Sequence, residues 1–100
     1  MNAPALALPP QDLQEFCARH HVHKLSLFGS IPTQRFRADS DIDLLVEFEP
    51  GHSPGLFGMI GMELELSEKL GRKVDLRTPR ELSRYFRYQV IANAAVQYER

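Results

Sequence analysis

Residues 27–48, LFGSIPTQRFRADSDIDLLVEF, decide the fold of this 100-residue chain. An apolar run ends there at Gly29-Ser30, and after ten further residues Asp41-Ile42-Asp43 opens a second apolar run. Over residues 41–48 one face of an extended chain would carry only apolar side chains, which is typical of a strand with a buried side. We predict one strand over residues 24–28, another over residues 41–48, and a loop or short helical turn between them.

The sequence on either side alternates between helical and extended patterns. It predicts a helix that begins at Pro9-Pro10 and buries Leu13, Phe16 and Cys17, and a second helix from a Ser53 cap to Leu70 with Gly71 as its terminator. A strand is predicted over residues 73–77, and a helix soon after Thr78-Pro79-Arg80-Glu81. Residues 85–94 are predicted to be helical, and Val96 and Tyr98 to form an extended piece. This order is typical of an α/β (α+β) fold in which helices cover a small mixed β-sheet. The length fits a single domain over residues 1–100, with residues 1–8 as a loose leader.

Composition and charge exclude several classes of protein. Hydrophobic residues make up 43% and charged residues 25% of the chain, as in ordinary globular proteins. The formal net charge of -1 supplies no field that would draw the chain onto nucleic acid or a membrane, so we expect neither as a direct partner. Cys17 is the single cysteine, which excludes an internal disulfide and fits a reducing compartment. No stretch reaches the roughly 20 apolar residues of a membrane span, and the N-terminus lacks a secretory signal, so the expected location is the cytoplasm.

Two carboxylates open the second strand of the central segment. Asp41 and Asp43 are two residues apart, so on a strand they point to the same side, about 7 Å apart along the chain. Like charges held this close repel each other unless a cation neutralises them. Carboxylate oxygens are ligands of hard divalent cations, and the spacing suits one ion or two ions about 3.5–4 Å apart. The pair therefore predicts a metal site, with strong solvation as the alternative.

A glycine, a serine and a third carboxylate extend this candidate site. Gly29 lets a phosphate approach the backbone closely, and Ser30 adds a hydroxyl donor at the end of a strand. Asp75 lies in the next predicted strand, 32 residues after Asp43, with apolar neighbours that point the other way. A crossover of this length that contains a helix can return the strand beside the previous one. We expect three aspartates from two strands to converge opposite a phosphate-binding turn.

This combination of Gly29-Ser30, ten residues, Asp41-Ile42-Asp43 and a later Asp75 closely resembles the minimal nucleotidyltransferases of the DNA polymerase β superfamily. The resemblance implies the nucleotidyltransferase fold, which is similar to the palm of polymerase β. It also implies that Asp41 and Asp43 bind two Mg²⁺ ions. Asp75 would hold the ion that activates the attacking hydroxyl and help to accept its proton, and Gly29 and Ser30 would hold the β- and γ-phosphates of ATP.

The resemblance extends to biological role. Proteins similar to this chain are commonly antitoxins paired with HEPN-type ribonuclease toxins. The implied activity is that of an adenylyltransferase, which moves AMP from a nucleoside triphosphate, ATP, onto a tyrosine of the toxin and releases pyrophosphate. The chain has no evident module that would hold an acceptor, so we expect the acceptor on another protein or another copy of the chain, and homo- or hetero-oligomers both stay open.

One stretch departs from the family pattern. After Gly-Ser the family continues with a run similar to Arg-Ala-Arg-Gly, whereas this chain has Ile31-Pro32-Thr33-Gln34. A missing guanidinium weakens triphosphate binding and Pro32 donates no N–H, although Arg35 or Arg37 could substitute from the same loop. Two alternatives therefore stay open. One is an antitoxin with weak catalysis that neutralises a ribonuclease by occlusion, and the other is a nucleotidyltransferase that acts on a small hydroxylated molecule.

Histidines raise a separate question. His20, His21 and His23 fall within four residues, but they have no cysteine partners and lack the ligand spacing of zinc motifs. We interpret them as structural or solvated residues. His52 lies in a turn-rich segment and carries no specific signal.

Overall fold

The computed structural model describes residues 8–28, 42–81 and 94–100, and the structural statements below concern these residues. Two helices, α1 (Pro10–Arg19) and α2 (Gly55–Leu70), pack on a sheet of four strands, β1 (Val22–Phe28), β2 (Ile42–Phe48), β3 (Val74–Arg77) and β4 (Ala95–Glu99). The predicted leader, the loop after Gly29-Ser30 and the helix over residues 85–94 lie outside the described residues, apart from residues 8 and 94.

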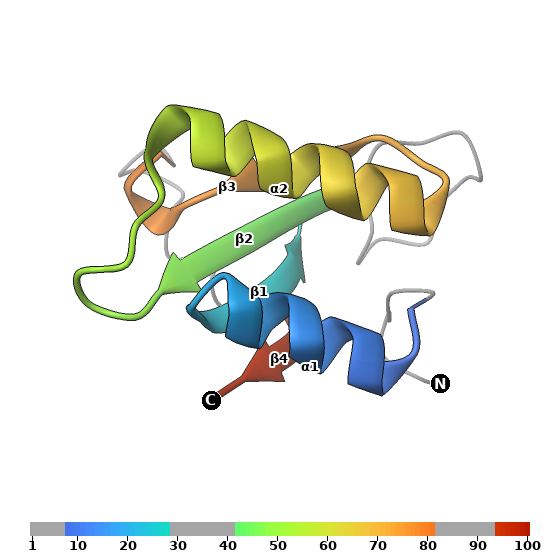
Figure 1. The fold of residues 1–100 in the computed structure, drawn as a ribbon, viewed down its shortest axis with the longest axis horizontal. Helices are drawn as coiled ribbons and strands as arrows, with labels where there is room; N and C mark the ends of the chain where they lie inside the picture. Colours follow the sequence, from blue (N-terminus) through green and yellow to red (C-terminus); the bar gives the residue numbers. More distant parts are fainter. Residues whose placement is uncertain (1–7, 29–41, 82–93) are drawn as a thin grey trace.

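The sheet is mixed and has the strand order β3-β2-β1-β4 (Figure 1). β1 pairs antiparallel with β2 and with β4, whereas β2 and β3 run parallel. Parallel neighbours need a long crossover, and α2 supplies it. The prediction of a small mixed sheet covered by helices is confirmed, and β4 is the extended piece expected at Val96 and Tyr98.

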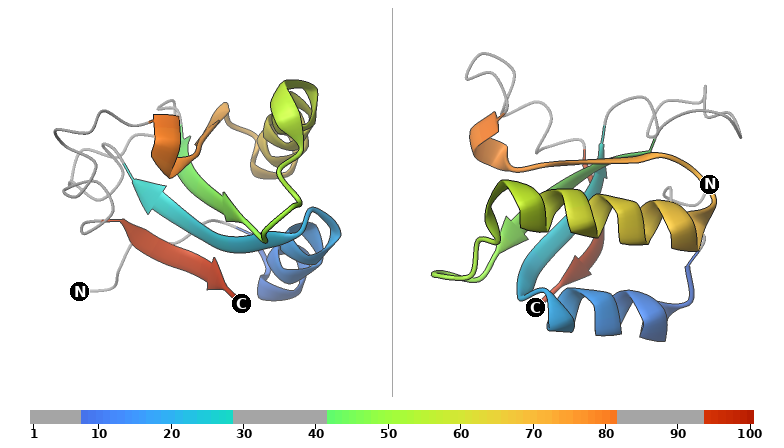
Figure 2. Two further views of the ribbon diagram at one scale, coloured as in Figure 1. Left: turned by 90° about the vertical axis from the view of Figure 1, so that its left-hand side faces the viewer. Right: turned by 45° about the horizontal axis from the view of Figure 1, so that its top comes forward.

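Both helices lie on one face of the sheet (Figure 2). Their apolar side chains pack against those strand residues that point toward them, as the alternation in β2 and β3 requires. The buried core consists of Leu13, Phe16, Cys17, Val22, Leu25, Leu27, Ile42, Leu44, Val46, Met62, Leu66, Val74 and Leu76. Neither helix in the described ranges is long and apolar enough to cross a membrane. The strand residues between the core positions point to the opposite face, which the two helices leave uncovered.

The ends of α2 partly match the sequence prediction. Gly71 terminates the helix in the left-handed conformation, with a φ of 67°, which a glycine adopts without steric cost. The predicted Ser53 cap is wrong, because the helix begins at Gly55 and Pro54 occupies the cap position without a side-chain hydrogen bond. Ser53 therefore lies one residue too early to bond the first free N–H groups.

Cys17 lies on the buried side of α1 with no exposed surface. Burial raises the pKa of its thiol to about 12, so almost none of it is thiolate in the native protein. Because the thiolate is the reactive form, we expect the folded chain to react with a thiol reagent at pH 8 only as fast as it unfolds. The urea-unfolded chain should react at once. Fast labelling of the native chain would contradict this burial.

An ion pair joins the C-terminal end of α1 to α2. Arg19 donates from Nη1 to Glu65 Oε1 at 3.1 Å and from Nη2 to Oε2 at 2.5 Å, and His20 Nε2 lies 3.1 Å from Oε1. The hydrogen bond from Arg19, followed by the contact with His20, lowers the pKa of the Glu65 carboxyl to about 2. Bidentate contacts of this kind fix the geometry as well as the charge.

The Glu65 contact should make stability depend on acid pH. Because the folded pKa is about 2 and the ordinary value is 4.5, the contact stabilises the fold fully above pH 4.5 and loses its effect as pH falls toward 2. The side chain of Glu65 is 25% exposed, so solvent screens the pair. We expect Glu65→Gln to lower the free energy of unfolding by ~1 kcal/mol at neutral pH. Urea unfolding of the parent and of Glu65→Gln across this pH range should show that the difference between their free energies of unfolding shrinks as the pH falls. A difference that does not depend on pH would contradict the assignment.

Candidate functional site

Two of the predicted metal-binding carboxylates lie side by side. Asp43 on β2 is the register partner of Asp75 on β3, and the two strands run parallel. Neighbouring strands are about 4.8 Å apart, and residues in register point to the same face of the sheet. The two side chains therefore leave adjacent backbones in the same direction. Both residues are half-buried. Residues 32 positions apart in the sequence are thus brought within reach of a single cation.

The core decides which face carries this pair. Val74 and Leu76 are each 2% exposed and pack under the helices, so Asp75 between them points the other way. Ile42 and Leu44 do the same for Asp43. The acidic pair therefore lies on the sheet face that α1 and α2 leave uncovered. If Asp75 had pointed into the helix-covered face, the two carboxylates could not have shared a ligand.

Two side chains of α2 hold β3 from its outer edge. β3 is the edge strand of the described sheet, so the N–H groups on its outer side have no strand partner there. Ser67 Oγ accepts a hydrogen bond from Val74 N at 2.9 Å, and Glu63 Oε2 accepts one from Leu76 N at 2.7 Å. Glu63 and Ser67 are four residues apart on one helix face, and their partners flank Asp75. Sequence reasoning missed both residues, and no local signal marks them.

The other predicted site residues, Gly29, Ser30 and Asp41, lie outside the described residues. The described residues that adjoin Gly29 and Asp41 in the sequence lie at the acidic pair. Phe28, which precedes Gly29, is the register partner of Asp43, and Ile42 follows Asp41 directly. The two aspartates that are described offer oxygen ligands, which hard divalent cations such as Mg²⁺ prefer. This donor set fits the metal that the sequence predicts.

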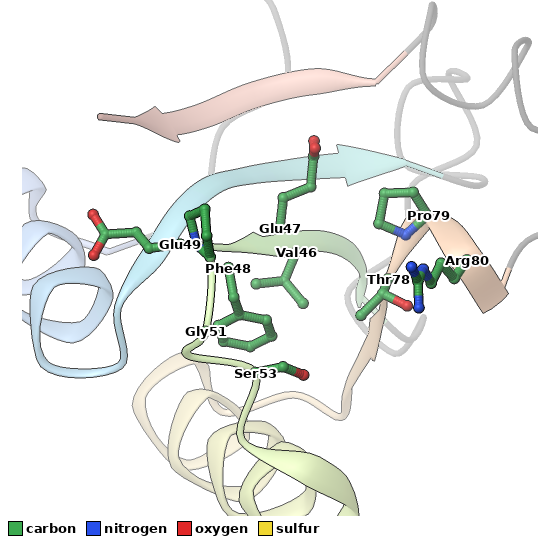
Figure 3. Close-up of a pocket in the computed structure, with 10 residues that line it drawn as sticks. Val46, Glu47, Phe48, Glu49, Gly51, Ser53, Thr78, Pro79 and Arg80 are labelled. Atoms are coloured by element: carbon green, nitrogen blue, oxygen red, sulfur yellow. The ribbon is translucent and has the colours of Figure 1, made fainter.

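A surface cavity of about 560 Å³ lies at the opposite ends of β2 and β3. Val46, Glu47, Ser53, Thr78 and Arg80 are among its lining residues (Figure 3). Glu47 is four residues further along β2 than Asp43, which corresponds to about 13 Å of extended chain. The cavity is therefore separate from the acidic pair. Apolar side chains such as Val46 and Phe48 line it together with hydroxyl and guanidinium groups, and neither Asp43 nor Asp75 is among its lining residues.

α2 exposes an unusual amount of apolar surface. Leu56, Phe57, Ile60 and Leu64 are 72%, 87%, 41% and 65% exposed. Their spacing places them along one side of the helix. Single exposed apolar residues are common in monomers, but contiguous groups of this kind mark contacts with other molecules.

Several known proteins are similar to this chain in sequence. The family described as polymerase beta, nucleotidyltransferase, matches residues 11–100. The protein adenylyltransferase MntA of Thermococcus cleftensis is 38% identical over 63 residues, which are 63% of this chain and 62% of that protein. A Methanocaldococcus jannaschii protein assigned to the protein adenylyltransferases is 42% identical over 60 residues, 60% of this chain and 62% of the relative. The matched segments thus span less than two thirds of these relatives.

Solved structures have the same fold. One assigned to the minimal nucleotidyltransferases is 36% identical, covers 85% of this chain and 85% of that chain, and has a TM-score of 0.69. The crystal structure of a toxin-antitoxin with AMP-PNP is 20% identical, covers 93% of this chain and 75% of that chain, and has a TM-score of 0.73. At that identity the second likeness concerns the fold alone. Because the family match covers residues 11–100, the chain belongs to the polymerase beta nucleotidyltransferase family.

Proposed function

We propose that this chain transfers AMP from ATP onto a hydroxyl group of a partner toxin and thereby acts as an antitoxin. The observation that carries the proposal is the in-register pair of Asp43 and Asp75 on the face of the sheet opposite α1 and α2. Transfer of a nucleotidyl group depends on positioning and on electrostatic stabilisation rather than on covalent chemistry of the protein. Two carboxylates on adjacent strands can provide both through bound cations.

The proposed roles follow the charge that each group carries. Asp41, Asp43 and Asp75 would hold two Mg²⁺ ions, and Gly29-Ser30 would bind the β- and γ-phosphates. When bound, Mg²⁺ neutralises phosphate oxygens and lowers the pKa of a coordinated hydroxyl. Asp75, on the edge strand of the described sheet, would orient the acceptor hydroxyl and take its proton. Rigid strands suit this task, because they hold the carboxylates in fixed relative positions.

The proposed reaction breaks one phosphorus–oxygen bond, forms another and moves one proton. The acceptor oxygen attacks the α-phosphorus of ATP in line with the bond to the β-phosphate. The new oxygen–phosphorus bond joins AMP to the acceptor, and pyrophosphate leaves with the electron pair of the broken bond. The proton of the acceptor hydroxyl passes to Asp75 and then to solvent.

Two observations support a protein acceptor. The exposed apolar residues of α2 provide a surface suited to another macromolecule rather than to a small polar substrate. A protein named as an adenylyltransferase, MntA, is among the relatives, and crystal structures of MntA with HepT share the fold. We therefore propose a HEPN-type toxin as the partner and one of its tyrosines as the acceptor.

A specific observation favours a second candidate function. Ile31-Pro32-Thr33-Gln34 supplies no guanidinium and lacks one backbone N–H after the predicted phosphate-binding turn. A chain that binds ATP weakly could still neutralise its toxin by covering the active site. Occlusion of this kind needs a stable complex but no transfer.

The deciding experiment combines transfer and neutralisation. The chain, the product of the gene beside its own, Mg²⁺ and ATP labelled at the α-phosphate are incubated together. Label on that product and its ribonuclease activity are both measured. Label on a toxin tyrosine together with loss of ribonuclease activity supports the proposal. Neutralisation without label supports occlusion, and label that moves only to a small acceptor contradicts both.

A further inference from the structure

Three side chains of types that can bind a metal ion meet at a second place in the fold, where α1, β1 and the turn before α2 come together. His21 follows α1, Glu49 follows β2, and His52 lies in the turn. Their ligand atoms all lie within 4.8 Å of one another. His21 Nδ1 is 3.7 Å from Glu49 Oε1, and the rings of His21 and His52 stack with centroids 4.0 Å apart.

Backbone hydrogen bonds hold the three residues together. Glu49 N donates to His21 O at 2.9 Å, and His52 N donates to Glu49 O at 3.0 Å. His21 has a φ of 57°, and it is the one non-glycine residue with positive φ among those the structure describes. A left-handed conformation is unfavourable for most residues and is often retained where the local structure serves a function. The arrangement is thus built into the main chain and does not depend on the side-chain contacts alone.

The two oxygens of the Glu49 carboxylate face different partners. Arg100 Nη1 contacts its Oε2 at 3.3 Å, which leaves Oε1 facing His21. In Figure 3 this carboxylate points away from Ser53 and Thr78. One oxygen is therefore available to a ligand beside the two imidazoles.

We propose that His21, Glu49 and His52 bind a borderline-soft divalent ion, Zn²⁺, with three protein ligands and one open position. Two imidazole nitrogens and one carboxylate oxygen form a donor set typical of zinc, and Mg²⁺ prefers oxygen ligands only. Bonds of about 2.0–2.1 Å in a tetrahedron place donor atoms about 3.3 Å apart, so the most distant pair must approach by about 1.5 Å.

The histidine rings must also turn when the ion binds. The planes of the two rings are inclined by only 17° to each other. A metal lies in the plane of each imidazole that ligates it, so stacked rings cannot share one ion. The side chain of His21 is 51% exposed and His52 is exposed, so both rings have space to rotate. The site would then fasten the end of α1 to the end of β2 and to the turn before α2.

This ion would not share ligands with the proposed Mg²⁺ site. Glu49 lies six residues after Asp43, about 20 Å along an extended chain. Excess Mg²⁺ can therefore occupy the acidic pair while Zn²⁺ is tested at the histidines. The inference does not depend on nucleotidyl transfer.

The test is calorimetric titration of ZnCl2 into the tag-free chain in excess Mg²⁺. We expect one ion per chain and at least a tenfold loss of affinity in His21→Asn and in His52→Asn. Asparagine tolerates the left-handed conformation at position 21, so this variant removes the imidazole without altering the backbone. His23→Asn, an exposed residue of β1 outside the cluster, is the matched control and should bind like the parent.

Nuclear magnetic resonance gives a second readout on the parent chain. Ring signals of His21 and His52 should shift on addition of Zn²⁺, and those of His23 should not. The proposal is overturned if no saturable binding occurs, or if His21→Asn and His23→Asn bind Zn²⁺ equally well. It is also overturned if the ring signals of His21 and His52 stay unchanged at saturation.

Discussion

Replacing Asp43 or Asp75 with asparagine is expected to slow AMP transfer at least about 100-fold, since a cation at the transferring phosphate contributes several kcal/mol to the transition state. Asparagine keeps the shape of the side chain and removes the charge that would hold the cation. Because the two carboxylates lie side by side, they also repel each other when no cation is bound. A bound cation relieves this repulsion, so both variants should gain less stability from added Mg²⁺ than the parent does. Rates of label transfer and melting temperatures with and without Mg²⁺ measure the two effects.

Glu47→Gln is the matched control for these variants. Glu47 lies on β2 four residues after Asp43, so it points to the same face of the sheet, and it is also half-buried. Its register partner is Lys24 on β1 rather than an acidic residue. Removing this charge should leave both the transfer rate and the response to Mg²⁺ unchanged. An equal loss of activity in Glu47→Gln would assign the effect to the general charge of the sheet and contradict a metal site at the pair.

The side of the sheet that carries the acidic pair could be predicted from the sequence. Ile42, Leu44, Val74 and Leu76 are apolar and must face the core, so the residue between each two must face away from it. The parallel pairing also followed, because the segment between β2 and β3 is long enough to contain a helix. The register itself could not be predicted, since a strand as short as Val74–Arg77 fits beside β2 in several positions.

Contacts between distant segments were beyond sequence reasoning. Glu63 and Ser67 accept hydrogen bonds from backbone N–H groups, and these are available only because β3 is an edge strand of the described sheet. The cluster of His21, Glu49 and His52 joins residues 28 and 3 positions apart, and a separation of 28 residues leaves no local signal in the sequence. The Ser53 cap failed for a local reason, because Gly55 has a φ of 78°, outside the right-handed helical region, and so separates Pro54 from the helical residues that follow.

Removing the α2 side chains that hold β3 should impair both stability and the site. In Glu63→Ala the N–H of Leu76 loses its acceptor, which costs about 1–3 kcal/mol when such a group stays shielded from water. Ser67→Ala should cost about 1 kcal/mol by the loss of one neutral hydrogen bond to Val74. Urea unfolding measures both. Because these two N–H groups flank Asp75, we also expect the Mg²⁺ concentration that gives half-maximal transfer to rise in each variant.

Glu63→Gln separates a positioning role from a purely electrostatic one. Glutamine keeps a carbonyl oxygen that can accept the hydrogen bond from Leu76 N, but it lacks the negative charge. If Glu63 acts by holding β3 in place, Glu63→Gln restores most of the stability and the Mg²⁺ dependence that Glu63→Ala loses. If Glu63→Gln behaves like Glu63→Ala in both assays, stability and Mg²⁺ dependence rest on the negative charge of Glu63 and not on its hydrogen bond with Leu76 N. If Glu63→Ala is unstable yet responds to Mg²⁺ like the parent, the contact supports the fold without positioning Asp75, and the geometry of the acidic pair then depends on the pairing of β2 with β3 alone.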